Sequence, residues 1–158
     1  MEPTSGQDEF TPTLREVRRR RADLHQALID VEEAISSPAG GRIESWTADV
    51  TKRLHSLLST IDEHIQVTER VGGLYDEITT RAPHLANQVR RLHDEHPAMR
   101  EQTFELVNRF ETEAVGDRWP VDEARDDVQR LLGRLVRHRQ HGADLVWEAY
   151  NLDIGGHE

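Results

Sequence analysis

Four of the nine histidines lie on the apolar stripes of four segments whose residue pattern predicts helices. Each shares its stripe with aliphatic or methionine side chains one or two turns away. The four are His25, His64, His96 and His138. Imidazole nitrogens are ligands that suit zinc, copper, iron and nickel. If the fold brings these rings together, they have the chemistry of a metal site.

The positions of the four histidines along their helices favour such a meeting. With a rise of ~1.5 Å per residue, His25 lies ~21 Å and His64 ~24 Å from one shared end of an up-and-down bundle, and the other two lie ~18 Å from it. Four neutral rings packed among aliphatic side chains would leave nitrogens unpaired, at about 1–3 kcal/mol each. A divalent cation would bind one nitrogen of every ring. The alternative is that each is an ordinary core histidine with a protein partner.

Two helices are predicted in the first half of the chain. The first runs from Thr11 to about Ser36, because apolar residues recur there at helical spacing. The second begins after Ser45, which we expect to be its N-cap. It continues to Ile78, with a bend at Gly72-Gly73. The apolar stripe of this second helix includes Val71 and Tyr75.

The third predicted helix runs from Leu85 to Phe110 and contains Pro97. A proline inside a helix donates no backbone hydrogen bond, so we expect a kink there and a free carbonyl at His93. The fourth helix begins with Pro120 as its first residue. We expect a glycine in the segment 151–156 to end it.

No segment has the pattern of a strand, so the chain is expected to be all-α. Four helices joined by short loops predict an antiparallel up-and-down four-helix bundle. We expect a flexible N-terminal tail at 1–10, the bundle at 11–150 and a C-terminal tail at 151–158.

Composition excludes several classes of function. The 158 residues carry a formal charge of −10, which disfavours nucleic acid and anionic membranes as partners. The basic run at 15–21 is interpreted as a solvated helix face. Because the chain has no cysteine, a disulfide or a thiolate metal site is excluded. No apolar run approaches the ~20 residues of a membrane helix, and no signal peptide is visible, so we expect a cytoplasmic protein.

The histidine-bearing segments together resemble the hemerythrin-like, HHE cation-binding family. The matching pieces are ADLHQAL, IDEHIQVTE, LHDEHPAM and LVRHRQHGADLVWEAY followed by NLDIGG. The resemblance covers most of the chain and implies an antiparallel four-helix bundle around a non-haem di-iron site. Family members bind dioxygen, sense oxygen, nitric oxide or redox state, or turn over peroxide. The resemblance thus implies iron at His25, His64, His96 and His138.

The sequence departs from the family where carboxylates bridge the two irons. Thr68 and Gly142 stand at those positions, and Glu69 and Asp144 are displaced from them around their helices. Without bridging anions, one divalent ion is easier to support than two. Glu69, through a distortion of its helix, and His93, as a ligand or an outer-shell donor, are additional candidates. Thr68 and Gly142 leave room for water, an anion or a small molecule, unless the site has decayed.

Three functions remain open from the sequence. The first is a metal-binding bundle, with one or two non-haem iron ions or with zinc, that binds or senses a small molecule such as dioxygen or nitric oxide. The second is a metal-free bundle that serves as an interaction or structural module or as a homodimer. The third, a peroxide or redox enzyme, has the least support because no general base or nucleophile accompanies the histidines.

Overall fold

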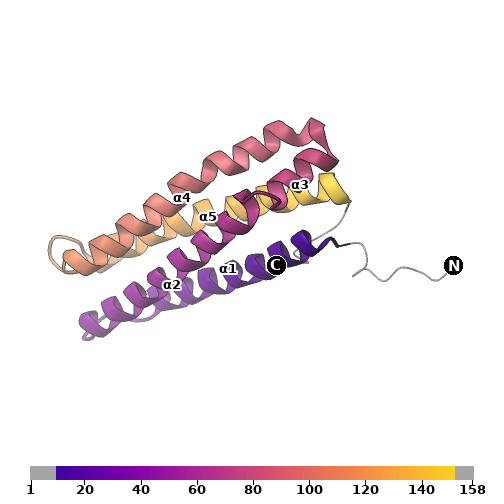
Figure 1. Ribbon diagram of the computed structural model, residues 1–158. Coiled ribbons are helices and arrows are strands. Elements are labelled where there is room, and N and C mark those ends of the chain that lie inside the picture. Colours follow the sequence, from indigo (N-terminus) through magenta and orange to yellow (C-terminus); the bar gives the residue numbers. More distant parts are fainter. Residues whose placement is uncertain (1–9, 152–158) are drawn as a thin grey trace.

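The computed structural model describes residues 10–151, and those residues form an all-helical bundle (Figure 1). Its elements are α1 (Pro12–Ser36), α2 (Ile43–Glu69), α3 (Leu74–Arg81), the 3-10 helix η1 (Pro83–Leu85), α4 (Ala86–Thr112) and α5 (Val121–Tyr150). The described part of the chain contains no strand, which confirms the predicted all-α class. The predicted tails at 1–10 and 151–158 fall almost wholly outside the described residues.

Each of the four long helices packs against two others. α1 contacts α2, α2 contacts α4, α4 contacts α5, and α5 contacts α1, so the helices enclose one shared interior. The loops that join α1 to α2 and α4 to α5 lie at one end of the bundle, and α3 lies at the other (Figure 1). None of the described helices combines the length and the apolar character needed to cross a bilayer.

Local chemistry explains where most helices begin and end. The side chain of Thr11 accepts a hydrogen bond from the backbone N–H of Leu14 and caps α1, at the residue where the sequence predicts this helix to begin. α2 begins at Ile43, so the prediction of Ser45 as its N-cap was wrong. Pro120 precedes α5 instead of being its first residue. Asn151 ends α5 in the left-handed conformation, φ 58°, which removes the need for the predicted glycine.

The predicted second helix is in fact two helices. α2 ends at Glu69, and α3 begins at Leu74 as a separate helix. Gly72 takes the left-handed conformation, φ +76°. A Cβ on Gly73 would lie 2.8 Å from two backbone carbonyl oxygens, so only glycine fits. The expected bend is therefore a break, and Val71, predicted to be buried, is 97% exposed.

The break gives α3 its own position at the end of the bundle. α3 packs on α1, α2 and α4, and Leu74, Tyr75 and Ile78 are buried. Pro97 lies inside α4 without ending it.

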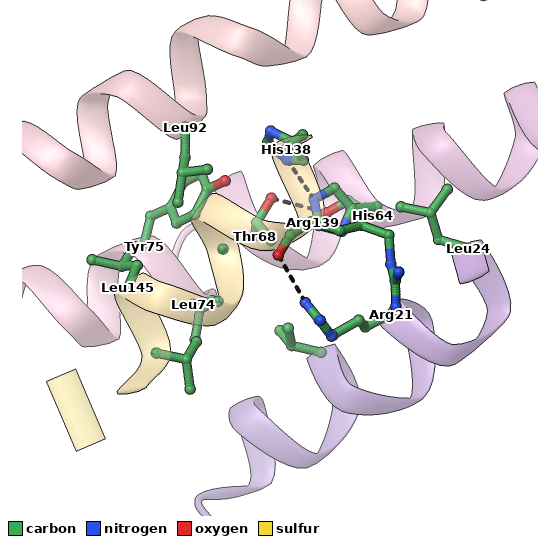
Figure 2. A pocket seen from close by; sticks show the side chains of 13 residues that line it. Arg21, Leu24, His64, Thr68, Leu74, Tyr75, Leu92, His138, Arg139 and Leu145 are labelled. Carbon is green, nitrogen blue, oxygen red and sulfur yellow. Dashed lines mark hydrogen bonds between the residues drawn. The ribbon is translucent and has the colours of Figure 1, made fainter. Parts of the chain in front are cut away.

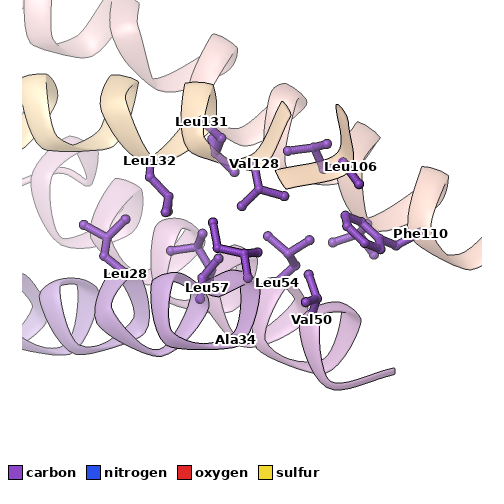
Figure 3. Packing of buried hydrophobic residues seen from close by; sticks show 14 of the residues in the cluster. Leu28, Ala34, Val50, Leu54, Leu57, Leu106, Phe110, Val128, Leu131 and Leu132 are labelled. Atoms are coloured by element: carbon purple, nitrogen blue, oxygen red, sulfur yellow. The ribbon is translucent and has the colours of Figure 1, made fainter. Parts of the chain in front are cut away.

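The buried apolar side chains form two clusters. The larger lies toward the α1–α2 and α4–α5 loops, where Leu28, Leu57, Leu106 and Leu131 point toward one another from the four long helices (Figure 3). The smaller lies at the α3 end. Along α2, α4 and α5 the residues of the two clusters are separated by a histidine: His64, His96 and His138 respectively. A polar layer therefore divides the core.

Candidate metal centre

Three histidine rings from three helices meet in this polar layer. Nε2 of His138 lies 3.2 Å from Nε2 of His64 and 3.2 Å from Nε2 of His96. The ring centroids are 4.8–5.3 Å apart. His96 and His138 are buried, and His64 is partly buried. Among the described residues these three form the one group of histidine and carboxylate side chains with the spacing of a metal site.

His25 does not belong to this group. The buried stripe of α1 contains Val17, Leu24 and Leu28, and His25 follows Leu24, about 100° further around the helix. His25 is therefore half-buried at the edge of the stripe. The residue of α1 nearest in register to the layer is Arg21, which lines the same cavity as His64 and His138. Its Nη1 donates a hydrogen bond to the carbonyl of Arg139, 3.1 Å away (Figure 2).

Two carboxylates support two of the rings from behind. Glu69 pairs with Nδ1 of His96, and Glu95 lies 2.7 Å from Nδ1 of His138. Nδ1 of His64, in contrast, is buried and has no hydrogen-bond partner among the described residues. A carboxylate on the far ring nitrogen orients a ligating histidine and makes it a better donor. Glu69 is thus placed as an outer-shell partner of the predicted site.

Each of these carboxylates also binds an exposed histidine. The second oxygen of Glu69 lies 3.0 Å from Nε2 of His93, three residues before His96. The second oxygen of Glu95 lies 3.0 Å from Nδ1 of His141, three residues after His138. His93 is therefore an outer neighbour in this structure, and the exposed His141 likewise has a carboxylate partner.

The carboxylates determine which ring nitrogens carry protons. An ionised carboxylate only accepts hydrogen bonds, so Nδ1 of His96 and of His138 is the donor. Burial lowers the pKa of His96 to about 3 and also lowers that of His138, so both rings are neutral near pH 7. Each Nε2 then carries a lone pair, and the two lone pairs face each other across 3.2 Å. A cation between them would turn this repulsion into two bonds.

The separation of the nitrogens is that of ligands around one ion. Donors ~2.1 Å from a metal lie about 3.0 Å apart at right angles and about 3.4 Å apart in a tetrahedron. Both measured separations of 3.2 Å fall between these values. The three histidines therefore have the spacing of side chains that could hold one metal ion, and Nε2 of His138 lies at a ligand-like distance from Nε2 of both neighbours.

Tyr75 brings an oxygen to the same layer. Its hydroxyl lies 3.2 Å from Nε2 of His96, and its ring stacks on that of His96 with an interplanar angle of 18°. Burial raises the pKa of Tyr75, so it is a neutral phenol in the metal-free protein, and its hydroxyl can donate to His96. Sequence reasoning placed Tyr75 on an apolar stripe and did not identify this contact.

A small cavity adjoins the rings. Its volume is about 30 Å³, and its walls include His64, His138, Thr68, Tyr75 and Gly142 (Figure 2). A single water molecule needs about 10–15 Å³ of such space, so the cavity accommodates one or two waters or a diatomic molecule. A Cβ on Gly142 would meet no other atom within 4 Å, which confirms that this position leaves space. The remaining walls are mainly aliphatic.

The buried neutral rings predict that the metal-free protein loses stability in mild acid. The unfolded chain takes up protons at its histidines as the pH falls below about 6.5, but the folded chain resists, because burial lowers the pKa of His64, His96 and His138. The contribution of these three histidines to the free energy of unfolding is therefore fully present above about pH 6.5. For His96, whose pKa in the folded chain is about 3, the loss should be about 1.4 kcal/mol between pH 7.5 and 5.5, and His64 and His138 add to it in the same direction. Urea unfolding in the presence of a chelator measures this.

The matched control for this pH series is His84→Ala, which removes an exposed histidine. Its curve should parallel that of the unmodified protein, whereas His96→Gln should reduce the slope. Equal unfolding free energies at pH 7.5 and 5.5 would contradict the assignment of neutral rings.

Comparison with known proteins adds no relative. No protein-family model, no curated protein and no solved structure matches this chain.

Proposed function

We propose that the protein is a hemerythrin-like, antiparallel bundle that holds one transition-metal ion at His64, His96 and His138 and binds or senses a small molecule there. Iron is the first choice, from the family resemblance, and zinc is the alternative from ligand chemistry. The observation that carries the proposal is the pair of Nε2–Nε2 separations of 3.2 Å between rings whose Nδ1 atoms face carboxylates.

The charges around the triad favour one ion over two. Glu69 and Glu95 contact the backs of the rings, so together they offset the charge of one divalent cation. Thr68 and Gly142 supply no bridging carboxylate for a second ion. Without such bridges, a second cation in this low-dielectric layer would be repelled by the first.

The adjoining cavity supports a small ligand. Three protein donors leave further positions on the ion, as in zinc and iron sites that bind water or substrate. The cavity volume of about 30 Å³ admits dioxygen, nitric oxide or water and excludes larger molecules. Leucine and valine side chains form much of the rest of its wall, which suits a weakly polar diatomic molecule.

The outer carboxylates should strengthen metal binding. We expect Glu69→Gln and Glu95→Gln each to weaken the affinity for zinc or ferrous iron by about 10- to 100-fold, since a neutral amide supports the ring less well than a carboxylate does. Competition with a fluorescent chelator gives the affinities. Glu63→Gln is the control, because Glu63, although next to His64 in the sequence, pairs with Arg20 at the surface. The same loss in Glu63→Gln would show a general charge effect instead.

Elemental analysis tests the proposal itself. The protein, purified without a histidine tag and loaded anaerobically, should retain about one equivalent of iron or zinc after gel filtration. Less than about a tenth of an equivalent of any transition metal would overturn the proposal. The metal-free interaction module would then be the function that remains.

A further inference from the structure

We infer that the hydroxyl oxygen of Tyr75 is a fourth protein donor to the ion, so that the site consists of three imidazoles and one phenolate. The inference rests on the proposed metal site. It goes beyond that site because it assigns to a residue of α3 a ligand role that neither the sequence pattern nor the family resemblance implies.

The distances that identify the triad also include Tyr75. Its oxygen lies 3.2 Å from Nε2 of His96, the same separation that joins Nε2 of His138 to its two neighbours. Oxygen ligands bind these metals at about the same distance as nitrogen ligands do, ~2.0–2.2 Å. Two donors that share an ion are therefore expected at this spacing, for an oxygen as much as for a nitrogen.

The backbone holds Tyr75 in this place. The break at Gly72 and Gly73 starts a new helix, and Tyr75 is the second residue of that helix. Leu74 and Ile78, which are buried on the same short helix, anchor α3 against the bundle. The ring of Tyr75 is itself buried and stacked on His96, so the hydroxyl has little freedom to turn away.

Thr68 connects this oxygen to the departure from the family pattern. Thr68 occupies the position where the family resemblance implies a bridging carboxylate, and it lines the same cavity as Tyr75. Thr68 is buried, and its Oγ1 also donates to the carbonyl of His64, 2.9 Å away. On this inference, an oxygen from α3 supplies the negatively charged ligand that Thr68 of α2 does not provide.

Ligation by Tyr75 forms one metal–oxygen bond and breaks the phenolic O–H bond, whose proton leaves to solvent. Metal sites release ligand protons in this way when they fill. In the metal-free protein the same hydroxyl donates to Nε2 of His96, which has no other protein donor facing it among the described residues. Iron accepts up to six donors, so four from the protein leave room for a ligand from the cavity.

Visible spectroscopy of the ferric protein tests the inference. Phenolate bound to ferric iron absorbs strongly in the visible region, because charge transfers from oxygen to metal. Protein loaded with ferrous iron without oxygen and then oxidised should show this band, together with phenolate vibrations in the resonance Raman spectrum. Tyr75→Phe should lose both while it retains its iron.

Tyr150→Phe is the matched control. The chain has only two tyrosines, and the hydroxyl of Tyr150 donates to Glu77, 2.9 Å away, outside the histidine layer. Tyr150→Phe should keep the band, and any phenolate signal in that variant belongs to Tyr75 even if Tyr75→Phe fails to fold. Iron-loaded unmodified protein without a phenolate signal would overturn the inference and leave the proposed function intact. Failure to bind iron or zinc would overturn the proposed function, and the inference with it.

Discussion

Replacement of His138 by alanine is expected to weaken the binding of zinc or ferrous iron by more than about 100-fold, because outer-shell changes alone cost 10- to 100-fold and a lost ligand costs more. Nε2 of His138 lies 3.2 Å from Nε2 of both other histidines, so its loss removes the nitrogen that adjoins both of the other two. Isothermal titration of the metal-free variant gives the affinity. Far-ultraviolet circular dichroism establishes that the helices are retained.

His25→Ala is the control for this experiment. His25 lies outside the triad in the structure, although the sequence pattern predicts it to be a ligand. The variant should bind the ion with unchanged affinity. A loss equal to that of His138→Ala would show that the site includes α1 and that the triad is not the complete set of imidazole donors. Unchanged binding by His138→Ala would contradict the site as a whole.

Removal of the ion is expected to lower the thermal stability substantially. An ion present at about 1,000 times its dissociation constant stabilises the folded chain by about 4 kcal/mol, since the unfolded chain does not assemble the three nitrogens. For a chain of this size, that corresponds to a melting temperature about 8–16 °C higher. Scanning calorimetry of metal-loaded and chelator-treated protein measures the difference.

Two variants make this stability experiment specific. His96→Gln should lose most of the difference between the melting temperatures with and without the ion, because one ligand is lost. His55→Ala, which removes an exposed histidine paired with Glu111 on the outer surface, should keep the full shift. Identical melting temperatures for loaded and metal-free protein would contradict metal-dependent stabilisation at the triad.

The all-helical bundle could be predicted from the sequence because the long helices have clear periodicity. The predicted bounds of the first helix, Thr11 to about Ser36, agree with those of α1, Pro12–Ser36. The break at Gly72 and Gly73 was predicted only as a bend. A glycine pair is compatible with either, and the outcome depends on the left-handed φ of Gly72 and on the packing of α3 against the bundle.

The site could be predicted in part for a related physical reason. His64, His96 and His138 fall between apolar residues that face the core, so periodicity places them inside. His25 differs from its buried neighbour Leu24 by one position, and a rotation of about 100° is enough to remove it from the site. The distance of a residue from the end of the bundle, estimated from its position in the sequence, does not show how far the residue is rotated around its helix.

The supporting residues could not be found from spacing alone. Glu95 is on α4 and contacts His138 on α5, and Tyr75 is on α3 and contacts His96 on α4. Contacts between helices depend on their relative rotation, which the sequence of one helix does not determine. Arg21 belongs to a basic run that looks solvated, yet it lines the cavity because it lies between Val17 and Leu24 on the buried stripe.

The absence of a triad residue on α1 has a consequence for access. A bound ion would join α2, α4 and α5 but would form no bond to α1. Outward movement of α1 would therefore open the cavity while every metal–nitrogen bond stays intact. The resistance to it would come from the buried apolar residues of α1, from Leu14 to Ile35, and from the hydrogen bond of Arg21 to the carbonyl of Arg139. Such transient opening would appear as amide hydrogen exchange that slows on metal binding in three long helices and stays fast in the fourth.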